Sequence, residues 1–198
     1  MAEERRDRIR DRETALPPTI DPGKVSPMTT LSVRPLEVED WARYRTLRLA
    51  ALADAPQAFG STLEREQAFT QERWRARLAR RGQFVAEDGD EACGLIGVVP
   101  EAPGIAQVVS MWVHPSARGR GTADLLLLTA LRWARDHGFS RVELWVTEGN
   151  TAAERLYARH GFQRTGRVQP VREGEPQREF SMARSGPVGD DRAGTATG

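Results

Sequence analysis

The strongest constraint on how this chain can fold lies between residues 108 and 134. An apolar, strand-like segment ends at Pro115, an arginine- and glycine-rich turn follows, and a long leucine- and alanine-rich helix is predicted after the turn. Gly119 and Gly121 allow the backbone to turn tightly and to approach a ligand closely. Because the first N–H groups and the positive dipole end of a helix favour an anion, this segment predicts a phosphate-binding turn.

Two widespread phosphate motifs do not account for this turn. The pattern Gly-x-x-x-x-Gly-Lys-Ser/Thr is excluded because the only lysine in the chain is Lys24, and no Gly-x-Gly-x-x-Gly follows a strand. Arg118 and Arg120 instead place two cations beside the turn.

The segment from Arg118 to Ala123 matches the Arg/Gln-x-x-Gly-x-Gly/Ala signature of the GNAT family, the Gcn-related N-acetyltransferases. Downstream, the segment from Asn150 to Phe162 resembles the Asn-x-x-Ala-x-x-x-Tyr-x-x-x-Gly-Phe segment of the same family. The two segments stand at the spacing that the family requires. The resemblance covers roughly residues 31–184, and on it the chain is identified as a member of this family.

The resemblance implies an α/β fold, the GNAT (acyl-CoA N-acyltransferase) fold, with a mixed central β-sheet flanked by helices in the order βααβββαβαββ. Alternation and helical spacing agree with it. We expect strands over residues 31–35, 84–86, 93–99, 105–113, 141–147, 162–168 and 178–184, a helix from about 37 to 54 and a second from about 64 to 80.

Composition fits one domain. The chain has 198 residues, 39% hydrophobic and 29% charged, which suffices for a substantial core. We expect the GNAT domain at residues 28–184. Residues 1–27 combine mixed charge and prolines with few large apolar groups, so they are predicted to be a disordered extension; residues 185–198 are predicted to be a disordered tail.

Several features predict a cytoplasmic protein. No apolar run approaches the roughly 20 residues of a membrane span, and the N-terminus has no apolar stretch typical of a secretory signal. Cys93 is the only cysteine, so an internal disulfide is impossible. A net charge of +1 provides no general attraction to nucleic acid or to a membrane, and neither is expected as a partner. Homodimers are common in the family that the chain resembles.

The resemblance implies acetyl-coenzyme A as co-substrate, held between two splayed strands that end near Val113 and Val146. The pantetheine amides would add to the first strand like a short extra strand, and the Met111 N–H would polarise the thioester carbonyl. Amides from Gly119 to Asp124 would hold the pyrophosphate. The donor-binding residues implied in this way are Met111, Trp112, Val113, Arg118, Gly119, Arg120, Gly121, Thr122, Ala123, Asp124, Asn150 and Tyr157.

Tyr157 falls on the tyrosine of the family segment and is the expected general acid. A phenol with a reference pKa of about 10 stays protonated at neutral pH and can give its proton to the departing thiolate. The alternative is a core aromatic residue on a helix face. Asn150 is expected both to cap the helix that follows and, by its family position, to contact the coenzyme.

The general base is not determined by the sequence. Some relatives carry a glutamate on the strand before the phosphate turn, but our alignment places Gln107 there, and an amide cannot accept a proton at neutral pH. A water chain, Glu64 or Glu66 could substitute, or the amine could arrive neutral. The histidines have no partners at metal-ligand spacing and Cys93 is expected to be buried, so no metal is expected.

Residues 56–64 lie between the first two helices, where GNAT enzymes usually line the acceptor pocket. Phe59 could form an apolar wall and Glu64 could attract an ammonium group; the alternative is an ordinary loop. The expected activity is acetyl transfer to a primary amine of a small molecule or peptide. The alternative, suggested by Gln107, is a sensing module that binds the coenzyme without transfer.

Overall fold

The computed structural model describes residues 31–80 and 82–186. The predicted extension, residues 1–27, lies outside the described residues, as does the predicted tail apart from its first two positions. Of these two, Ser185 ends the last strand of the sheet, which is one residue longer than the predicted strand 178–184.

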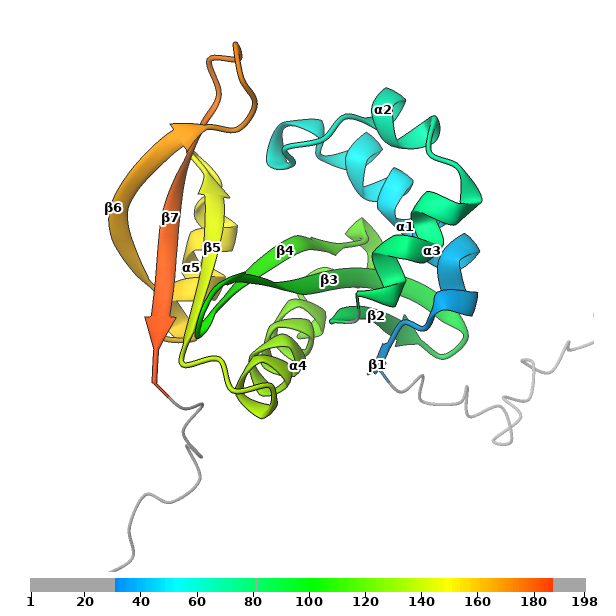
Figure 1. The fold of residues 1–198 in the computed structure, drawn as a ribbon, viewed down its shortest axis with the longest axis horizontal. Helices are drawn as coiled ribbons and strands as arrows, with labels where there is room; N and C mark the ends of the chain where they lie inside the picture. Colours follow the sequence, from blue (N-terminus) through cyan, green and yellow to red (C-terminus); the bar gives the residue numbers. More distant parts are fainter. Residues whose placement is uncertain (1–30, 81, 187–198) are drawn as a thin grey trace, which may run out of the picture.

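A seven-stranded mixed sheet forms the centre of the molecule, in the order β1-β2-β3-β4-β5-β7-β6 (Figure 1). Neighbouring strands are antiparallel except β4 and β5, which run parallel. The strands are β1 (Leu31–Pro35), β2 (Gln83–Asp88), β3 (Glu91–Ala102), β4 (Ile105–Val113), β5 (Arg141–Thr147), β6 (Gln163–Pro170) and β7 (Arg178–Ser185). The mixed sheet expected from the sequence is therefore confirmed.

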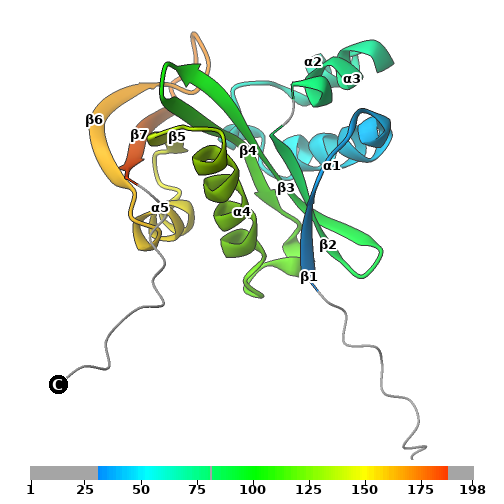
Figure 2. The ribbon, with the colours of Figure 1, turned by 60° about the horizontal axis from the view of Figure 1, so that its bottom comes forward.

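Helices cover both faces of the sheet (Figure 2). The α-helices are α1 (Trp41–Asp54), α2 (Leu63–Gln67), α3 (Gln71–Ala79), α4 (Thr122–Asp136) and α5 (Thr151–Arg159). Short 3-10 turns are η1 (Val38–Asp40), η2 (Pro56–Ala58) and η3 (Pro115–Ala117).

Alternation along the strands divides the core into two layers. On β2, Phe84 and Ala86 join the core that packs against α4, whereas Val85 joins the core that packs against α1 and α3. On β3, Ile96 belongs to the first core and Leu95 to the second. Because successive side chains of a strand point to opposite faces, the sheet carries an apolar core on each side.

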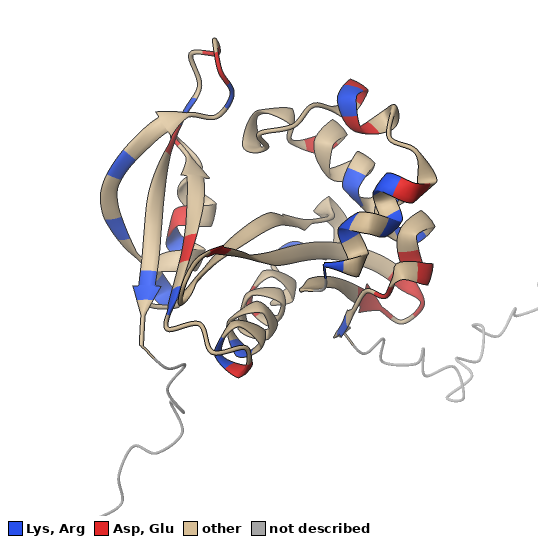
Figure 3. Cartoon of the chain, in the orientation of Figure 1, with Lys and Arg blue, Asp and Glu red and all other residues tan. Residues whose placement is uncertain are grey.

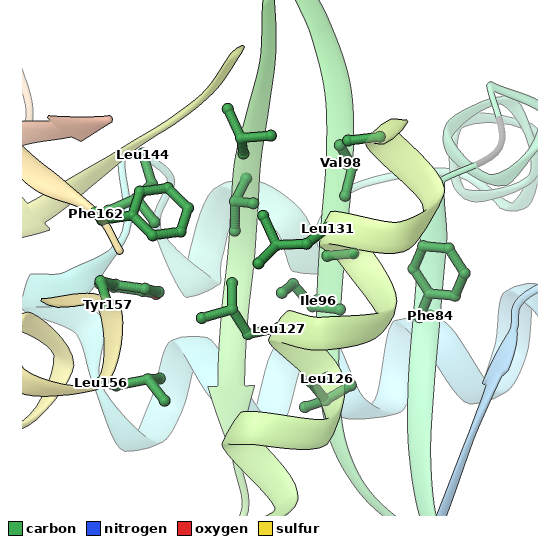
Figure 4. Close-up of a cluster of buried hydrophobic side chains, with 14 of the residues drawn as sticks. Phe84, Ile96, Val98, Leu126, Leu127, Leu131, Leu144, Leu156, Tyr157 and Phe162 are labelled. Atoms are coloured by element: carbon green, nitrogen blue, oxygen red, sulfur yellow. The ribbon is translucent and has the colours of Figure 1, made fainter. Parts of the chain in front are cut away.

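The leucines of α4 supply the centre of the first core. Leu126, Leu127 and Leu131 are buried, and Figure 4 shows them on the side of α4 that faces Ile96. Their spacing is that of one helical face, as the sequence predicted. Tyr157 of α5 belongs to the same core, so α4 and α5 share one apolar layer against the sheet.

The second helical stretch differs from the sequence prediction. The predicted single helix from about 64 to 80 is two helices, α2 and α3, separated at residues 68–70. Each helix has its own threonine cap: Thr62 Oγ1 accepts a hydrogen bond from the Arg65 amide at 3.3 Å, and Thr70 Oγ1 accepts one from the Arg73 amide at 3.4 Å. A threonine cap satisfies N–H groups that a continuous helix would bond internally, so Thr70 begins a new helix.

We expect Leu127→Ala to lower the free energy of unfolding by about 2–5 kcal/mol, because the substitution leaves a cavity in a fully buried layer. The neighbouring Leu128 is 37% exposed, so Leu128→Ala should change that free energy by no more than about 0.5 kcal/mol. Urea unfolding followed by circular dichroism measures both. Equal losses in the two variants would contradict the assignment of Leu127 to the core.

Candidate active site

The two parallel strands at the centre of the sheet separate soon after they pair. β4 and β5 pair at only three positions, Ile105 with Arg141, Ala106 with Val142 and Gln107 with Glu143. Beyond them β4 continues to Val113 beside β3, and β5 continues to Thr147 beside β7. We call this opening the fork. It provides the two splayed strands that the family resemblance led us to expect.

A β-bulge lies on the β4 side of the fork. Gly97 pairs with Val109 and Leu95 with Trp112, so two residues of β4, Ser110 and Met111, lie opposite a single residue of β3. Ser110 has a positive φ of 57°, the non-glycine residue that takes this conformation among the described residues. Because a bulge leaves the extra residue outside the regular ladder, β4 can present a backbone group to a ligand in the fork.

A cleft of about 930 Å³ occupies the fork. Residues of α4, α5 and the turn before α4 line one part of it, among them Arg118, Ala123, Asn150, Ala153, Tyr157 and Arg159. Residues of the other helices and of the last two strands line another part, among them Arg48, Phe59, Glu66, Arg77, Gln169 and Glu179. The floor between them includes Gln107, Met111, Trp112 and Val113 of β4.

The turn before α4 has room for an anion. Gly119 and Gly121 have positive φ values of 74° and 83°, and no heavy atom lies within 4 Å of a Cβ placed on either. The Leu125 amide donates to the Gly121 carbonyl at 3.0 Å, so the amides of the preceding helical residues have no intrahelical acceptor. This geometry fits a coenzyme pyrophosphate, because open space and several N–H donors meet at one helix N-terminus.

The two arginines of the turn each pair with a carboxylate. Arg118 pairs with Asp54 and also donates from Nε to the Val113 carbonyl at 3.0 Å; Arg120 pairs with Asp88 at 2.5 Å. Asp54 accepts a further hydrogen bond from Trp112 Nε1 at 2.9 Å. The Trp112 hydrogen bond, followed by that from Arg118, lowers the pKa of Asp54 below its ordinary value. The end of α1 is thus fastened to β4 and to the turn.

Tyr157 is 6% exposed and lines the cleft. Its ring packs against Phe162 with centroids 5.8 Å apart, and Figure 4 shows the two rings close together. Burial raises the pKa of Tyr157 above its ordinary value. The phenol is therefore a core aromatic group that also lines the cleft and stays protonated at neutral pH; its role as general acid stays a prediction.

The first turns of α4 and α5 are held by side chains. Asn150 Oδ1 accepts a hydrogen bond from the Ala153 amide at 3.1 Å, which confirms the predicted helix cap. Asp124 binds Arg159 at 2.7 Å and His160 Nε2 at 2.8 Å. This contact joins the start of α4 to the end of α5, so the two helix ends that border the cleft keep their relative position.

The structure corrects the expectation for Glu64. This side chain is exposed and is not among the residues that line the cleft, whereas Glu66 is fully buried and lines it. Two residues apart on a helix are about 200° apart around its axis, so one of the pair faces the core and the other faces solvent. Phe59 does line the cleft, as the sequence suggested, and is 8% exposed.

Glu66 lies between two arginines. Arg48 donates to it from Nε and Nη2, both at 3.0 Å, and Arg77 donates from its two terminal nitrogens at 2.8 Å and 3.3 Å. Burial opposes ionisation of Glu66, but the hydrogen bonds from Arg48 and then Arg77 outweigh it and lower its pKa to about 2. Figure 3 shows basic segments on α1 and α3, the two helices that bring these arginines together. Glu66 is therefore a paired anion and is unsuited to accept a proton.

Sequence reasoning missed Glu179 on β7. It lies opposite Thr147 of β5, lines the cleft and accepts a hydrogen bond from Gln169 Nε2 at 2.8 Å. Burial raises the pKa of Glu179 above its ordinary value, against the effect of Gln169. Only the pairing of β7 with β5 brings this carboxyl to the fork, so no local pattern marked it.

No group of three or more His, Cys, Asp and Glu side chains suited to a metal ion occurs within residues 31–80 and 82–186. The histidines contact neighbours near helix ends or turns: His114 Nδ1 contacts Ser116, and His137 Nδ1 lies 2.8 Å from the Trp133 carbonyl. Cys93 is buried, as expected. None of the described helices has the length and apolar character needed to cross a membrane.

A sequence profile of the acetyltransferase (GNAT) family matches residues 44–162. This span includes most of the residues that line the cleft. The chain belongs to this family.

Curated relatives match over part of their length. Rat N-acetyltransferase 8B is 36% identical over 94 residues, which cover 45% of this chain and 42% of that protein. A mycothiol acetyltransferase from Thermomonospora curvata is 36% identical over 114 residues, which cover 58% of this chain and 37% of that protein. The chain therefore spans less than half the length of these relatives.

Solved structures share the fold. An acetyltransferase of the GNAT family from Streptococcus pneumoniae superposes with a TM-score of 0.67 at 21% identity and covers 79% of this chain and 99% of its own. The structure of yncA from Salmonella typhimurium, a putative acetyltransferase with its cofactor acetyl-CoA, superposes with a TM-score of 0.66 at 20% identity and covers 85% and 99%. The GNAT fold expected from the sequence is confirmed.

We expect Glu66→Gln to lower the free energy of unfolding at pH 7 by about 3–5 kcal/mol, because it leaves two arginines without their shared anion. The folded pKa of Glu66, about 2, lies below its ordinary 4.5, so the unfolded chain takes up the proton first as the pH falls. The stabilisation is complete above about pH 4.5 and is lost toward pH 2.

Denaturant unfolding at several pH values measures this effect, with Glu64→Gln on the exposed side of α2 as the matched control. The control should stay within about 0.5 kcal/mol of the wild type. A wild-type stability that is no more sensitive to pH below 4.5 than that of Glu66→Gln would contradict the assignment.

Proposed function

We propose that this protein transfers the acetyl group of acetyl-CoA to a primary amine by direct attack of the amine on the thioester. The observation that carries the proposal is that one cleft is lined by the strands of the fork, by Arg118 and Ala123 at the two ends of the glycine turn before α4, and by the buried Tyr157. Such a cleft accommodates a long donor that carries a pyrophosphate at one end and a thioester near the other.

The residues that would hold the donor lie on β4, on the turn before α4 and at the start of α5, and those of β4 line the cleft. Amides from Gly119 to Asp124 would bind the pyrophosphate, with Arg118 and Arg120 beside it. Backbone groups of Met111 and Val113 would bind the pantetheine amides as an added strand, and Trp112 would keep this part of β4 fixed through its bond to Asp54. Asn150 and Ala123 line the same part of the cleft.

The chemistry forms a C–N bond and breaks a C–S bond. The Met111 N–H, at the bulge in the fork, would donate to the thioester oxygen as negative charge develops there. Tyr157 would give its proton to the departing sulfur. Burial raises the pKa of the phenol, so it stays protonated at neutral pH and keeps a proton to donate.

Glu179 is our candidate for the group that takes the proton from the attacking amine. It is the carboxyl group of β7 at the cleft, and its pKa is raised by burial, which is the direction a general base near neutral pH requires. Gln107 also lines the cleft but, as an amide, cannot serve. Glu179 thus supplies a carboxylate from β7 where some relatives have one on β4.

The names of similar proteins support the donor more than the acceptor. The yncA structure contains acetyl-CoA, and a PaiA N-acetyltransferase structure from Thermoplasma acidophilum contains coenzyme A. The curated relatives include mycothiol acetyltransferases as well as N-acetyltransferase 8B, and the second name states no acceptor. We therefore draw the donor from these names and leave the acceptor to the structure of the cleft.

Mass spectrometry tests the proposal: the purified protein is mixed with acetyl-CoA and a panel of amines, amino acids, aminoglycosides and peptides, and released coenzyme A and acetylated amine are measured. An acetylated product supports the transferase. Coenzyme binding without product from any amine would overturn it in favour of a sensing module, the alternative that Gln107 suggests.

We expect Tyr157→Phe to lower kcat by about 10²- to 10⁴-fold with little change in coenzyme affinity, because the ring stays and only the acidic O–H is lost. The other tyrosine provides a matched control. Tyr44 is 3% exposed and is not among the residues of the cleft, so Tyr44→Phe should leave kcat near the wild-type value. Steady-state kinetics and coenzyme titration distinguish the two. Unchanged turnover in Tyr157→Phe would refute the role of general acid.

For Glu179 we expect a signature in the pH profile. Activity of the wild type should fall on the acid side as the carboxylate takes up a proton through its raised pKa. Glu179→Gln should lower kcat/KM by about 10²-fold at neutral pH and remove that acid limb. Glu173→Gln, on the exposed loop between β6 and β7, is the control and should keep the wild-type profile. An acid limb that persists in Glu179→Gln would assign it to another group.

A further inference from the structure

Arg48 stands out in the part of the cleft away from the phosphate turn. It is 5% exposed and lines the cleft. On α1 it interrupts a buried stripe made by Tyr44, Leu47, Ala51 and Leu52. A guanidinium so deeply buried is rare unless all of its donors are bound.

One nitrogen of Arg48 has no partner. Nε and Nη2 both donate to Glu66, but Nη1 is buried and has no hydrogen-bond acceptor in the described part of the chain. Because the guanidinium is planar and its side edge faces Glu66, the N–H bonds of Nη1 point away from that carboxylate. A buried donor of this kind calls for an acceptor.

The surroundings of Arg48 are cationic. Glu66 balances only one of the two arginines that share it, and both of its oxygens already accept two hydrogen bonds. The other carboxylates of the cleft make their contacts elsewhere, Asp54 with Trp112 and Arg118, and Glu179 with Gln169. The cluster of Arg48, Glu66 and Arg77 therefore keeps one net positive charge at the cleft.

Phe59 holds the Arg48 guanidinium in a fixed orientation. The Cζ atom of Arg48 lies 4.6 Å from the centroid of the Phe59 ring, and both side chains line the cleft. A guanidinium held between a carboxylate at its edge and a ring at its face is preorganised, so little entropy is lost when it binds a planar oxyanion.

We propose that the acceptor is a small amine that carries a carboxylate group, and that the guanidinium of Arg48, which lines the cleft and keeps one donor nitrogen unpaired, binds this carboxylate. The inference rests on the proposed acetyl transfer and names the acceptor class for it. The acceptor would share the cleft of about 930 Å³ with the pantetheine part of acetyl-CoA, which favours an amino-acid-sized acceptor over a large one. The proposal replaces the expected ammonium site at Glu64, because Glu64 does not line the cleft whereas the Arg48 cation does.

The test uses matched acceptors that differ only in this group, each amino acid beside its carboxamide, with kcat/KM measured for each pair. In the wild type we expect the carboxylate member of the preferred pair to exceed its carboxamide by about 10- to 100-fold, typical of a hydrogen bond to a charged group. Arg48→Met should bring this ratio close to one by weakening the carboxylate substrate, and Arg48→Lys should restore part of it.

Arg65→Met is the matched control, because Arg65 is exposed on α2 and is not among the residues of the cleft; it should keep the wild-type ratio. A general structural defect in Arg48→Met would lower both members of the pair and leave the ratio unchanged. A wild-type ratio near one, or a ratio unaffected in Arg48→Met, would overturn the proposal while acetyl transfer itself stood.

Binding tests the same contact without turnover. Calorimetry with coenzyme A present compares N-acetyl amino acids with their carboxamides, and we expect the carboxylates to bind about 10-fold more tightly in the wild type but not in Arg48→Met. Equal affinities in the wild type would overturn the subsite. If the mass spectrometry detects no acetyl transfer, the calorimetry still tests whether Arg48 binds a carboxylate. The failure of the proposed activity and the failure of the carboxylate subsite are therefore distinguishable.

Discussion

The parting of β4 from β5 is the constraint on which the rest of this structure depends. These two parallel strands pair at three positions and then diverge. Beyond those positions, the backbone groups of β4 and β5 no longer bond to one another, although they lie in the middle of the sheet. The bulge at Ser110 and Met111 places one of these groups where a donor would lie. A continuous sheet would use these groups in hydrogen bonds between β4 and β5, whereas the fork leaves space between the two strands.

Packing on both faces keeps the fork open. The leucines of α4 pack against the first four strands on one face of the sheet. On the other face, α1 and α3 cover the sheet through a separate core. Side-chain contacts then fasten the borders: Asp54 joins α1 to Trp112 and Arg118, and Asp124 joins α4 to the end of α5. Because β4 and β5 both contribute buried side chains to the core beneath α4, neither strand can move toward the other without loss of core contacts.

Charge differs along the cleft. Near the phosphate turn, arginines and helix amides favour an anionic donor end, and the carboxylates of that region are paired with arginines. Farther along, Glu179 is a carboxyl whose pKa is raised, whereas Glu66 is held ionised by two arginines. One carboxyl therefore has its pKa shifted toward neutral pH while the other serves as a fixed anion that positions Arg48.

The sequence by itself determined the features that depend on local chemistry: the glycine turn before α4, the leucine face of α4 and the cap of α5 at Asn150. The break between α2 and α3 also has a local cause, the cap at Thr70, but the sequence prediction did not treat Thr70 as the start of a new helix. Only the tertiary structure decided that Glu66 rather than Glu64 enters the cleft, that Arg48 keeps a free donor there and that Glu179 reaches the fork. Those placements depend on contacts between residues far apart in the chain, which local periodicity does not encode.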